Sequence, residues 1–373
     1  MLFPKVIISG FEEGGTTLLA EILKTSGYES YFEIGVLLAD TPKIYRSDQK
    51  FKDHYEIIES DIFLNANSKA LAAAPEMYKG INLESLNTSI EGFRLKDFEQ
   101  FDFESFESFY NSIFSFGFNN LKFFDKTPKY MSVIGEILRK RDFFEKYLII
   151  TRDPRAIFWS RVKRRAINKK LELPKEIDSS FINSNFPGFF SDFFKSYNLY
   201  AMGCISYLNH PKILFIKHED LMNEPDKELG IIADFIQEKE LFFPARDQVT
   251  SKDYKYVYQG VKKSTATEYN KFLKPDLCQF ILDETAESAY FFNNENTKKH
   301  KDEFNKKLSL VHKILEKFNL PSYLYNLEDD FGMDPVFYLL TQSRVLKKGL
   351  NPWEHYKKFG KGYGFSPYQN VIS

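Results

Sequence analysis

The residues best suited to chemistry form a glycine-rich loop near the start of the chain, at residues 10–17. Glycines let backbone N–H groups turn toward an anion, and a helix that begins directly afterwards adds the partial positive charge of its N-terminus. The spacing is that of a phosphate-binding loop, with Thr16 at the usual lysine position and Thr17 at the hydroxyl position. Because that lysine normally reaches the β- and γ-phosphates, its replacement argues against a Mg²⁺-dependent kinase or nucleotide triphosphatase.

A second anion-binding pattern follows an apolar run that ends at residue 151. Arg152 comes directly after this run, an Asp-Pro pair turns the chain, and Ser160 lies eight residues after Arg152 on a predicted helix. A guanidinium can donate two hydrogen bonds to one phosphate, and a hydroxyl two helical turns further on can bind the same phosphate from the opposite side. We interpret the cations that follow as a solvated helix face: Arg161, Lys163, Arg164 and Arg165.

Together, the two motifs resemble those of sulfotransferases that use 3′-phosphoadenylyl sulfate (PAPS) as donor and release 3′-phosphoadenosine 5′-phosphate (PAP). The family's 5′-phosphosulfate loop usually reads Gly-x-Pro-Arg-Ser-Gly-Thr-Thr, and residues 10, 15, 16 and 17 match it. An Arg and a Ser eight residues later bind the 3′-phosphate in that family. The segment 261–273 is similar to the loop that covers this phosphate. The donor-binding residues that the resemblance implies are Gly14, Gly15, Thr16, Thr17, Arg152, Ser160, Lys262 and Lys263. It also implies that no metal ion is needed.

The loop departs from the family pattern at Glu13, where an Arg or Lys is usual. A carboxylate at this position would repel the bridging oxygen and the leaving phosphate of the donor. We therefore keep a second hypothesis, a catalytically degenerate sulfotransferase-fold protein that binds PAP, PAPS or a glycan without turnover. On these grounds Glu13→Arg should raise donor affinity or leave it unchanged.

Two further residues are candidates for catalysis. Lys126 lies in a segment similar to the Lys-Thr-Pro motif of glycan- and tyrosine-directed sulfotransferases, whose lysine lies near the donor's sulfate or the acceptor. In-line sulfuryl transfer also requires a base for the acceptor hydroxyl. Glu33 occupies the place of that branch's glutamate base, and its apolar neighbours can raise a carboxylate's pKa toward the working range. His54 is the alternative base.

The elements that must position these residues alternate between short apolar runs and helical patterns. Runs at 5–9, 121–124, 147–151 and 213–216 predict strands, and residues 16–24 carry apolar side chains at helical spacing. This alternation predicts an α/β, P-loop-like three-layer fold with a central parallel sheet.

The residue composition changes twice toward the end of the chain. We predict a sulfotransferase domain over 1–295, a helical linker over 296–330 and a small helical C-terminal appendage over 331–373. The tail resembles a short module appended to bacterial glycosyltransferases, in its pattern of Asp-Pro, Gly, His-Tyr and Pro residues.

The composition of the chain limits the kinds of partner that it can bind. The net charge of −1 gives no overall basic field for nucleic acid, and no stretch reaches the ~18 apolar residues of a membrane span. Two cysteines are too few for a disulfide framework, and no group of residues has metal-ligand spacing. We expect a cytoplasmic enzyme without a metal, acting on a small-molecule or glycan acceptor.

Overall fold

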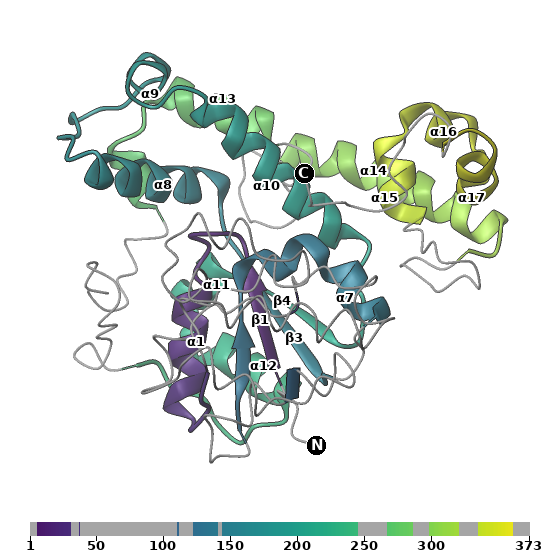
Figure 1. Cartoon of the computed structure of the whole chain (residues 1–373), viewed down its shortest axis with the longest axis horizontal. Helices are drawn as coiled ribbons and strands as arrows, with labels where there is room; N and C mark the ends of the chain where they lie inside the picture. Colours follow the sequence, from purple (N-terminus) through teal and green to yellow (C-terminus); the bar gives the residue numbers. More distant parts are fainter. Residues whose placement is uncertain are drawn as a thin grey trace, which may run out of the picture.

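The computed structural model describes residues 6–30, 37, 110–111, 122–140, 144–244, 267–285, 298–320 and 335–360. The centre of the fold is a parallel sheet (Figure 1), in which the strands lie in the order β2-β1-β3-β4. Its strands are β1 (Val6–Gly10), β2 (Phe124–Lys126), β3 (Lys146–Thr151) and β4 (Ile213–Lys217). The predicted α/β class with a central parallel sheet is confirmed.

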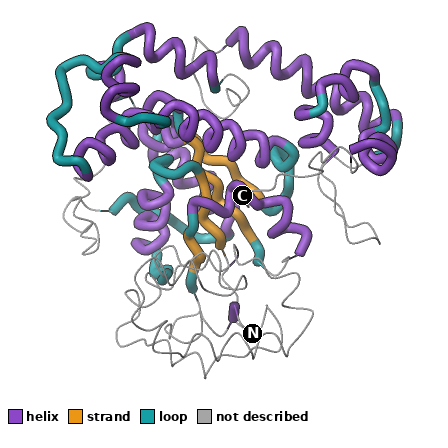
Figure 2. The backbone as a smooth tube through the Cα atoms, turned by 45° about the horizontal axis from the view of Figure 1, so that its top comes forward, coloured by secondary structure: helices purple, strands orange, loops and turns teal. Residues whose placement is uncertain are grey.

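Helices surround this sheet, as the tube view shows (Figure 2). Beside the first three strands lie α1 (Thr16–Thr25), the 3₁₀ helix η4 (Pro128–Val133), α7 (Ile134–Lys140) and α8 (Pro154–Asn168). Helices α9 (Ser179–Asn185) and α10 (Phe189–Ile205) precede β4 in the chain, and α11 (His218–Asn223) and α12 (Pro225–Ile236) follow it. The chain continues through η6 (Glu268–Lys271), α13 (Pro275–Glu284), α14 (Lys298–Lys317), α15 (Pro335–Thr341), α16 (Ser343–Lys348), α17 (Pro352–His355) and the π-helical η9 (Tyr356–Gly360).

Alternating side chains of the strands build two separate cores. In β1, Val6 and Ile8 pack with apolar residues of α1 and α12, whereas Ile7 packs with residues of η4, α8 and α10 on the opposite face. In β3, Leu148 and Tyr147 divide in the same way. Successive side chains of a strand point to opposite faces, so a parallel sheet buried on both sides needs apolar residues at every position. This accounts for the continuous apolar runs and gives the three predicted layers.

Strand β2 differs from its predicted position. The apolar run at 121–124 suggested the strand, but its pairing with Val6–Ile8 covers Phe124–Lys126, and Phe123 forms only an isolated bridge with Glu29. The strand therefore includes two ionisable residues, Asp125 and Lys126, at its carboxyl end. This register brings Lys126 beside the loop that follows β1.

The C-terminal helices continue the core on the α10 side of the sheet. Helix α14 lies in the segment predicted as a helical linker, and α15 contacts both α14 and α10. Val336 and Leu339 of α15 are almost fully buried in the same apolar cluster as residues of α8 and α10. Within the tail, the Tyr338 hydroxyl lies 2.9 Å from His355 Nδ1. The division at residues 295 and 330 stays a prediction. None of the helices in the described ranges has the length and apolar character to cross a membrane.

Candidate anion-binding site

The loop between β1 and α1 has the backbone geometry of an anion site. Gly15 caps α1 in a left-handed conformation (φ 111°), and no side chain caps the helix. The first N–H groups of an α-helix have no partner within the helix. The Gly14 N–H donates to the Phe11 carbonyl (2.8 Å), and a Cβ on Gly14 would lie 2.7 Å from that oxygen. Gly14, Gly15, Thr16 and Thr17 thus form a tight turn that ends in the open N-terminus of a helix.

His218, the first residue of α11, packs against Gly15 of this loop. A Cβ on Gly15 would lie 2.8 Å from His218 Cδ2 and 3.1 Å from Ile150 Cδ1, so only glycine fits there. His218 is buried, and this burial, followed by the charge of Arg152, lowers its pKa well below the usual 6.5. The ring is therefore neutral and has a packing role.

Lys126 reaches the same loop from the neighbouring strand. Its Nζ donates to Thr17 Oγ1 (3.4 Å), and the residue is 3% exposed. The preceding Asp125 accepts hydrogen bonds from the hydroxyls of Tyr110 and Tyr130, both at 2.7 Å. Burial raises the pKa of Asp125 to about 7, against the lowering effect of these two hydrogen bonds. The structure thus brings together Lys126 and Thr17, two of the predicted site residues.

Arg152 joins the second motif to the first. It follows the last residue of β3, is largely buried, and donates from Nη1 to the Glu13 carbonyl oxygen (2.9 Å). Burial lowers the pKa of this guanidinium, whereas the carboxylates of Glu219, Asp153, Glu268 and Glu13 oppose that effect and favour the charged form. A buried cation at the carboxyl edge of a parallel sheet, in contact with the loop, can bind a second phosphate of one ligand.

Ser160 lies on α8, whose start is fixed by its own cap. The Asp153 carboxylate accepts from the Arg155 backbone N–H (2.9 Å) and forms an ion pair with the Arg155 guanidinium (2.6 Å). Eight residues of chain separate Ser160 from Arg152, and Ser160 is partly exposed. Both residues belong to the β3–α8 unit.

The segment that begins at Thr267 packs against α8. Trp159 stacks on Phe272 with 4.6 Å between the ring centroids and donates from Nε1 to Glu268 (3.3 Å), while the Tyr269 hydroxyl donates to Asp153 (3.3 Å). This is the end of the segment predicted to cover the 3′-phosphate. Lys262 and Lys263 themselves lie outside the described residues. So do Glu33 and His54, the two candidate bases.

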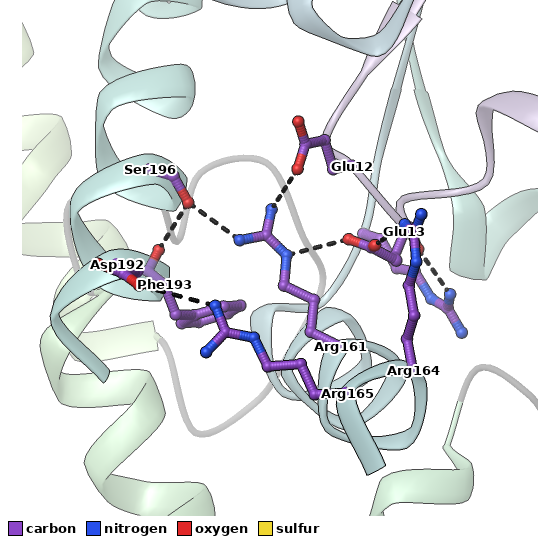
Figure 3. A network of polar contacts seen from close by, with 9 residues as sticks. Glu12, Glu13, Arg161, Arg164, Arg165, Asp192, Phe193 and Ser196 are labelled. Atoms are coloured by element: carbon purple, nitrogen blue, oxygen red, sulfur yellow. Dashed lines mark hydrogen bonds and ion pairs between the residues drawn. The ribbon is translucent and has the colours of Figure 1, made fainter. Parts of the chain in front are cut away.

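Glu13 binds cations that the sequence reasoning assigned to solvent (Figure 3). Its Oε2 accepts from Arg161 Nε (3.0 Å) and its Oε1 from Arg164 Nη1 (2.8 Å). Arg161 also binds Glu12 (3.4 Å) and the Ser196 hydroxyl (3.1 Å), and its side chain is only 17% exposed. The interpretation of these cations as a solvated face is therefore wrong for Arg161.

The side chains of the other cations on this helix are more exposed to solvent than that of Arg161. Lys163 pairs with Glu268 (2.6 Å), and Arg165 pairs with Asp192 (3.6 Å). The side chains of Arg164 and Arg165 are 56% and 41% exposed. The signal that could have revealed the Glu13 network was charge complementarity, since two adjacent glutamates lie within the glycine-rich loop and a basic helix follows the second motif. Among the described residues, no group of three or more His, Cys, Asp or Glu side chains could hold a metal ion.

Comparison with known proteins finds a match to one family model. Residues 136–318 match the model of the sulfotransferase domain family, a range that includes β3, α8, Arg152 and Ser160. None of the curated protein sequences matches the chain significantly.

Three solved structures are similar to parts of this chain. The sulfotransferase domain of the Synechococcus PCC 7002 olefin synthase shares 17% identity at a TM-score of 0.47, over 78% of this chain and 96% of that one. The sulfotransferase domain from the curacin biosynthetic pathway shares 17% identity at a TM-score of 0.42, over 76% and 98%. Sulfotransferase STF9 from Mycobacterium avium shares 11% identity at a TM-score of 0.38, over 79% and 78%.

Proposed function

Because residues 136–318 match the model of the sulfotransferase domain family, we propose that this chain is a sulfotransferase that transfers a sulfuryl group from PAPS to a hydroxyl acceptor. The observation that carries the proposal is the hydrogen bond from Arg152 to the Glu13 carbonyl, which puts the two anion-binding motifs in direct contact. PAPS carries anionic groups at both its 5′ and 3′ ends, so a site for it needs two such motifs side by side.

Each end of the donor has its own residues in this proposal. The backbone N–H groups of residues 14–17 and the hydroxyls of Thr16 and Thr17 hold the 5′-phosphosulfate. Arg152 and Ser160 hold the 3′-phosphate, with Lys262 and Lys263 adding charge to it. The open helix N-terminus at Gly15 and the buried position of Arg152 support this assignment.

The reaction forms one bond to sulfur and breaks another. The acceptor oxygen attacks sulfur in line with the bridging oxygen, the sulfur–oxygen bond to the phosphate breaks, and PAP leaves with the electron pair. Glu33 takes the acceptor's proton. Lys126, whose Nζ lies 3.4 Å from Thr17 Oγ1, offsets the negative charge that develops on the transferring group and the leaving oxygen.

We place the acceptor in the carbohydrate class. Two resemblances favour it: the segment around Lys126 is similar to that of glycan- and tyrosine-directed sulfotransferases, and the tail is similar to a module of bacterial glycosyltransferases. Free thiols at Cys204 and Cys278 fit a reducing, cytoplasmic setting.

Two measurements test the proposal. Calorimetry with PAP should show binding, and ³⁵S-labelled PAPS should give labelled product with at least one member of a panel of glycans, tyrosine peptides and small alcohols. Labelled product from glycans alone supports a carbohydrate acceptor. Labelled product only from tyrosine peptides or small alcohols overturns the assignment of the acceptor to the carbohydrate class. PAP binding without transfer to any acceptor supports the degenerate binding protein, and absence of PAP binding overturns the donor assignment.

A further inference from the structure

Three guanidinium groups of the β3–α8 unit converge on Glu13. Arg152 binds its backbone carbonyl (2.9 Å), while Arg161 and Arg164 bind the two carboxylate oxygens at 3.0 and 2.8 Å. Glu13 is thus attached to this unit through its main chain and through its side chain, whose contacts with Arg161 and Arg164 are drawn in Figure 3.

The backbone of Glu13 explains why these contacts matter. Its φ of 61° lies in the left-handed region, which non-glycine residues adopt at an energetic cost. Such conformations persist where surrounding contacts hold them. The Glu13 side chain is only 16% exposed, and the residues after it are the two glycines that turn the loop into α1.

We propose that Glu13 is a positioning residue that fastens the phosphate-binding loop to α8 through Arg161 and Arg164, and thereby fixes the separation of the donor's two phosphate sites. The role rests on the proposed function, since it assumes PAPS as the ligand. The carboxylate that should repel the donor is directed at two cations instead, so its charge is balanced within the network.

This inference reverses the expectation for Glu13→Arg. An arginine side chain there would match the family pattern, but it would face Arg152, Arg161 and Arg164, and like charges at this range repel. Donor affinity should therefore fall.

Glu13→Gln separates the positioning role from simple repulsion. If Glu13 only repels the donor, removal of its charge strengthens PAP binding at low salt, and the gain disappears at high salt because salt screens exposed charges. If Glu13 positions the loop, PAP binding weakens by about tenfold, the cost of losing a charge-assisted contact. Because this loss has a geometric origin, it persists from about 50 mM to about 500 mM NaCl.

A charge reversal provides the second test. The double variant Glu13→Arg with Arg161→Glu restores opposite charges across the contact, and it should recover part of the PAP affinity that Glu13→Arg loses. Arg165→Gln is the matched control, because it removes a cation from the same helix that pairs with Asp192 and not with the loop. Equal losses in Arg165→Gln and Glu13→Gln would overturn the proposal, and so would a double variant no better than Glu13→Arg alone.

A test without ligand keeps this role distinct from the proposed function. Glu13→Gln, Arg161→Gln and their combination form a double-mutant cycle read out by urea unfolding of the full chain. Non-additive losses support the attachment of the loop to α8, and additive losses overturn it whatever the ligand is. If the cycle shows coupling but the wild-type chain binds no PAP, the attachment stands, whereas the donor-positioning role and the proposed function both fail.

Discussion

Arg152 lies at the junction of the two proposed anion-binding motifs, because it follows β3 and donates to the Glu13 carbonyl in the loop before α1. Tyr197 donates to the Arg152 carbonyl (2.9 Å), so the main chain of this residue is also held. Its side chain combines a fixed position with a fork of donors. We expect both properties to matter for phosphate binding.

Arg152→Lys should weaken PAP binding by about 10- to 100-fold. The charge remains, but the fork is lost, and hydrogen bonds to charged groups contribute roughly 1.5–3 kcal/mol. Calorimetry measures the change. Arg165→Lys makes the same substitution where the side chain is 41% exposed, and it should alter affinity less than twofold. Unchanged PAP affinity in Arg152→Lys would contradict the role of Arg152 in binding.

Lys126→Met should lower kcat by about 10²–10³-fold, as removal of one charge-stabilising donor does in other enzymes, with a smaller effect on PAP affinity. The reason is that its Nζ donates to Thr17 Oγ1, within the proposed 5′-phosphosulfate site. Steady-state kinetics with PAPS separates the two effects. Lys129→Met, an exposed lysine three residues later, is the control and should retain full activity. A Lys126→Met variant with normal kcat would remove Lys126 from the mechanism.

At the scale of elements, the loop after β1 depends on contacts with β3 and α11. Gly10, Gly14 and Gly15 each lie where a Cβ would come within 3.0 Å of a neighbouring atom. The neighbours of Gly15 are His218 of α11 and Ile150 of β3. The shape of the loop is therefore determined by elements far away in the sequence.

Gly15→Ala should destabilise the fold by about 1–3 kcal/mol and abolish measurable PAP binding. The alanine would be strained at φ 111° and would collide with the His218 ring. Urea unfolding and calorimetry measure the two effects. Gly230→Ala, in α12 with nothing within 4 Å of the added Cβ, should instead stabilise by about 0.5–1 kcal/mol. Normal PAP binding by Gly15→Ala would show that the loop tolerates a different shape.

Most of the sheet and its order of motifs could be predicted, because β-branched runs between helical patterns specify buried parallel strands. Those runs identified β1, β3 and β4, and they placed Arg152 directly after the end of β3. For β2 the apolar run predicted the wrong residues. The strand pairs with β1 through Phe124, Asp125 and Lys126, and Phe123 forms only an isolated bridge. The direction of the Glu13 side chain could not be predicted from the sequence either. It depends on a positive φ and on Arg161, 148 residues away. Glu33, Lys262 and Lys263 stay predictions.

At the scale of the whole molecule, two buried carboxyl groups link stability to pH. Burial raises the pKa of both Asp125 and Glu219 to about 7, from ordinary values of 3.8 and 4.5. A raised folded-state pKa means that the folded chain holds the proton more tightly than the unfolded chain does. The resulting stabilisation is complete below about pH 4 and is lost as the pH rises through about 7.

Asp125→Asn should reduce this loss, because asparagine does not titrate and its carbonyl still accepts from Tyr110 or Tyr130. The free energy of unfolding of the variant should therefore rise relative to wild type as the pH rises. Each unit of pKa difference corresponds to about 1.4 kcal/mol. Urea unfolding at pH 5 to 8 gives the two profiles, and Asp192→Asn, at an exposed residue, is the control. Parallel profiles for Asp125→Asn and wild type would contradict the prediction.

The buried apolar face of α15 leads to a prediction about cooperativity. Leu339→Ala removes a fully buried side chain from the cluster shared with α8 and α10, and should cost about 2–5 kcal/mol. Because the cluster is shared, the entire unfolding transition should shift. Leu310→Ala in α14, at a residue that is 38% exposed, should cost less than about 1 kcal/mol. Two transitions, of which only one shifts, would show that the tail unfolds independently.

The stacking of Trp159 on Phe272 gives the molecule an intrinsic optical reporter. The chain has two tryptophans, Trp159 on α8 and Trp353 in the C-terminal helices. Indole emission depends on its surroundings, and Trp159 is 3% exposed and in contact with Glu268 and the Lys163 ammonium group, 5.3 Å from its ring. In a Trp353→Phe background, tryptophan fluorescence would come from α8 alone. Ligand titrations could then be followed by emission from beside the proposed donor site, with no attached dye.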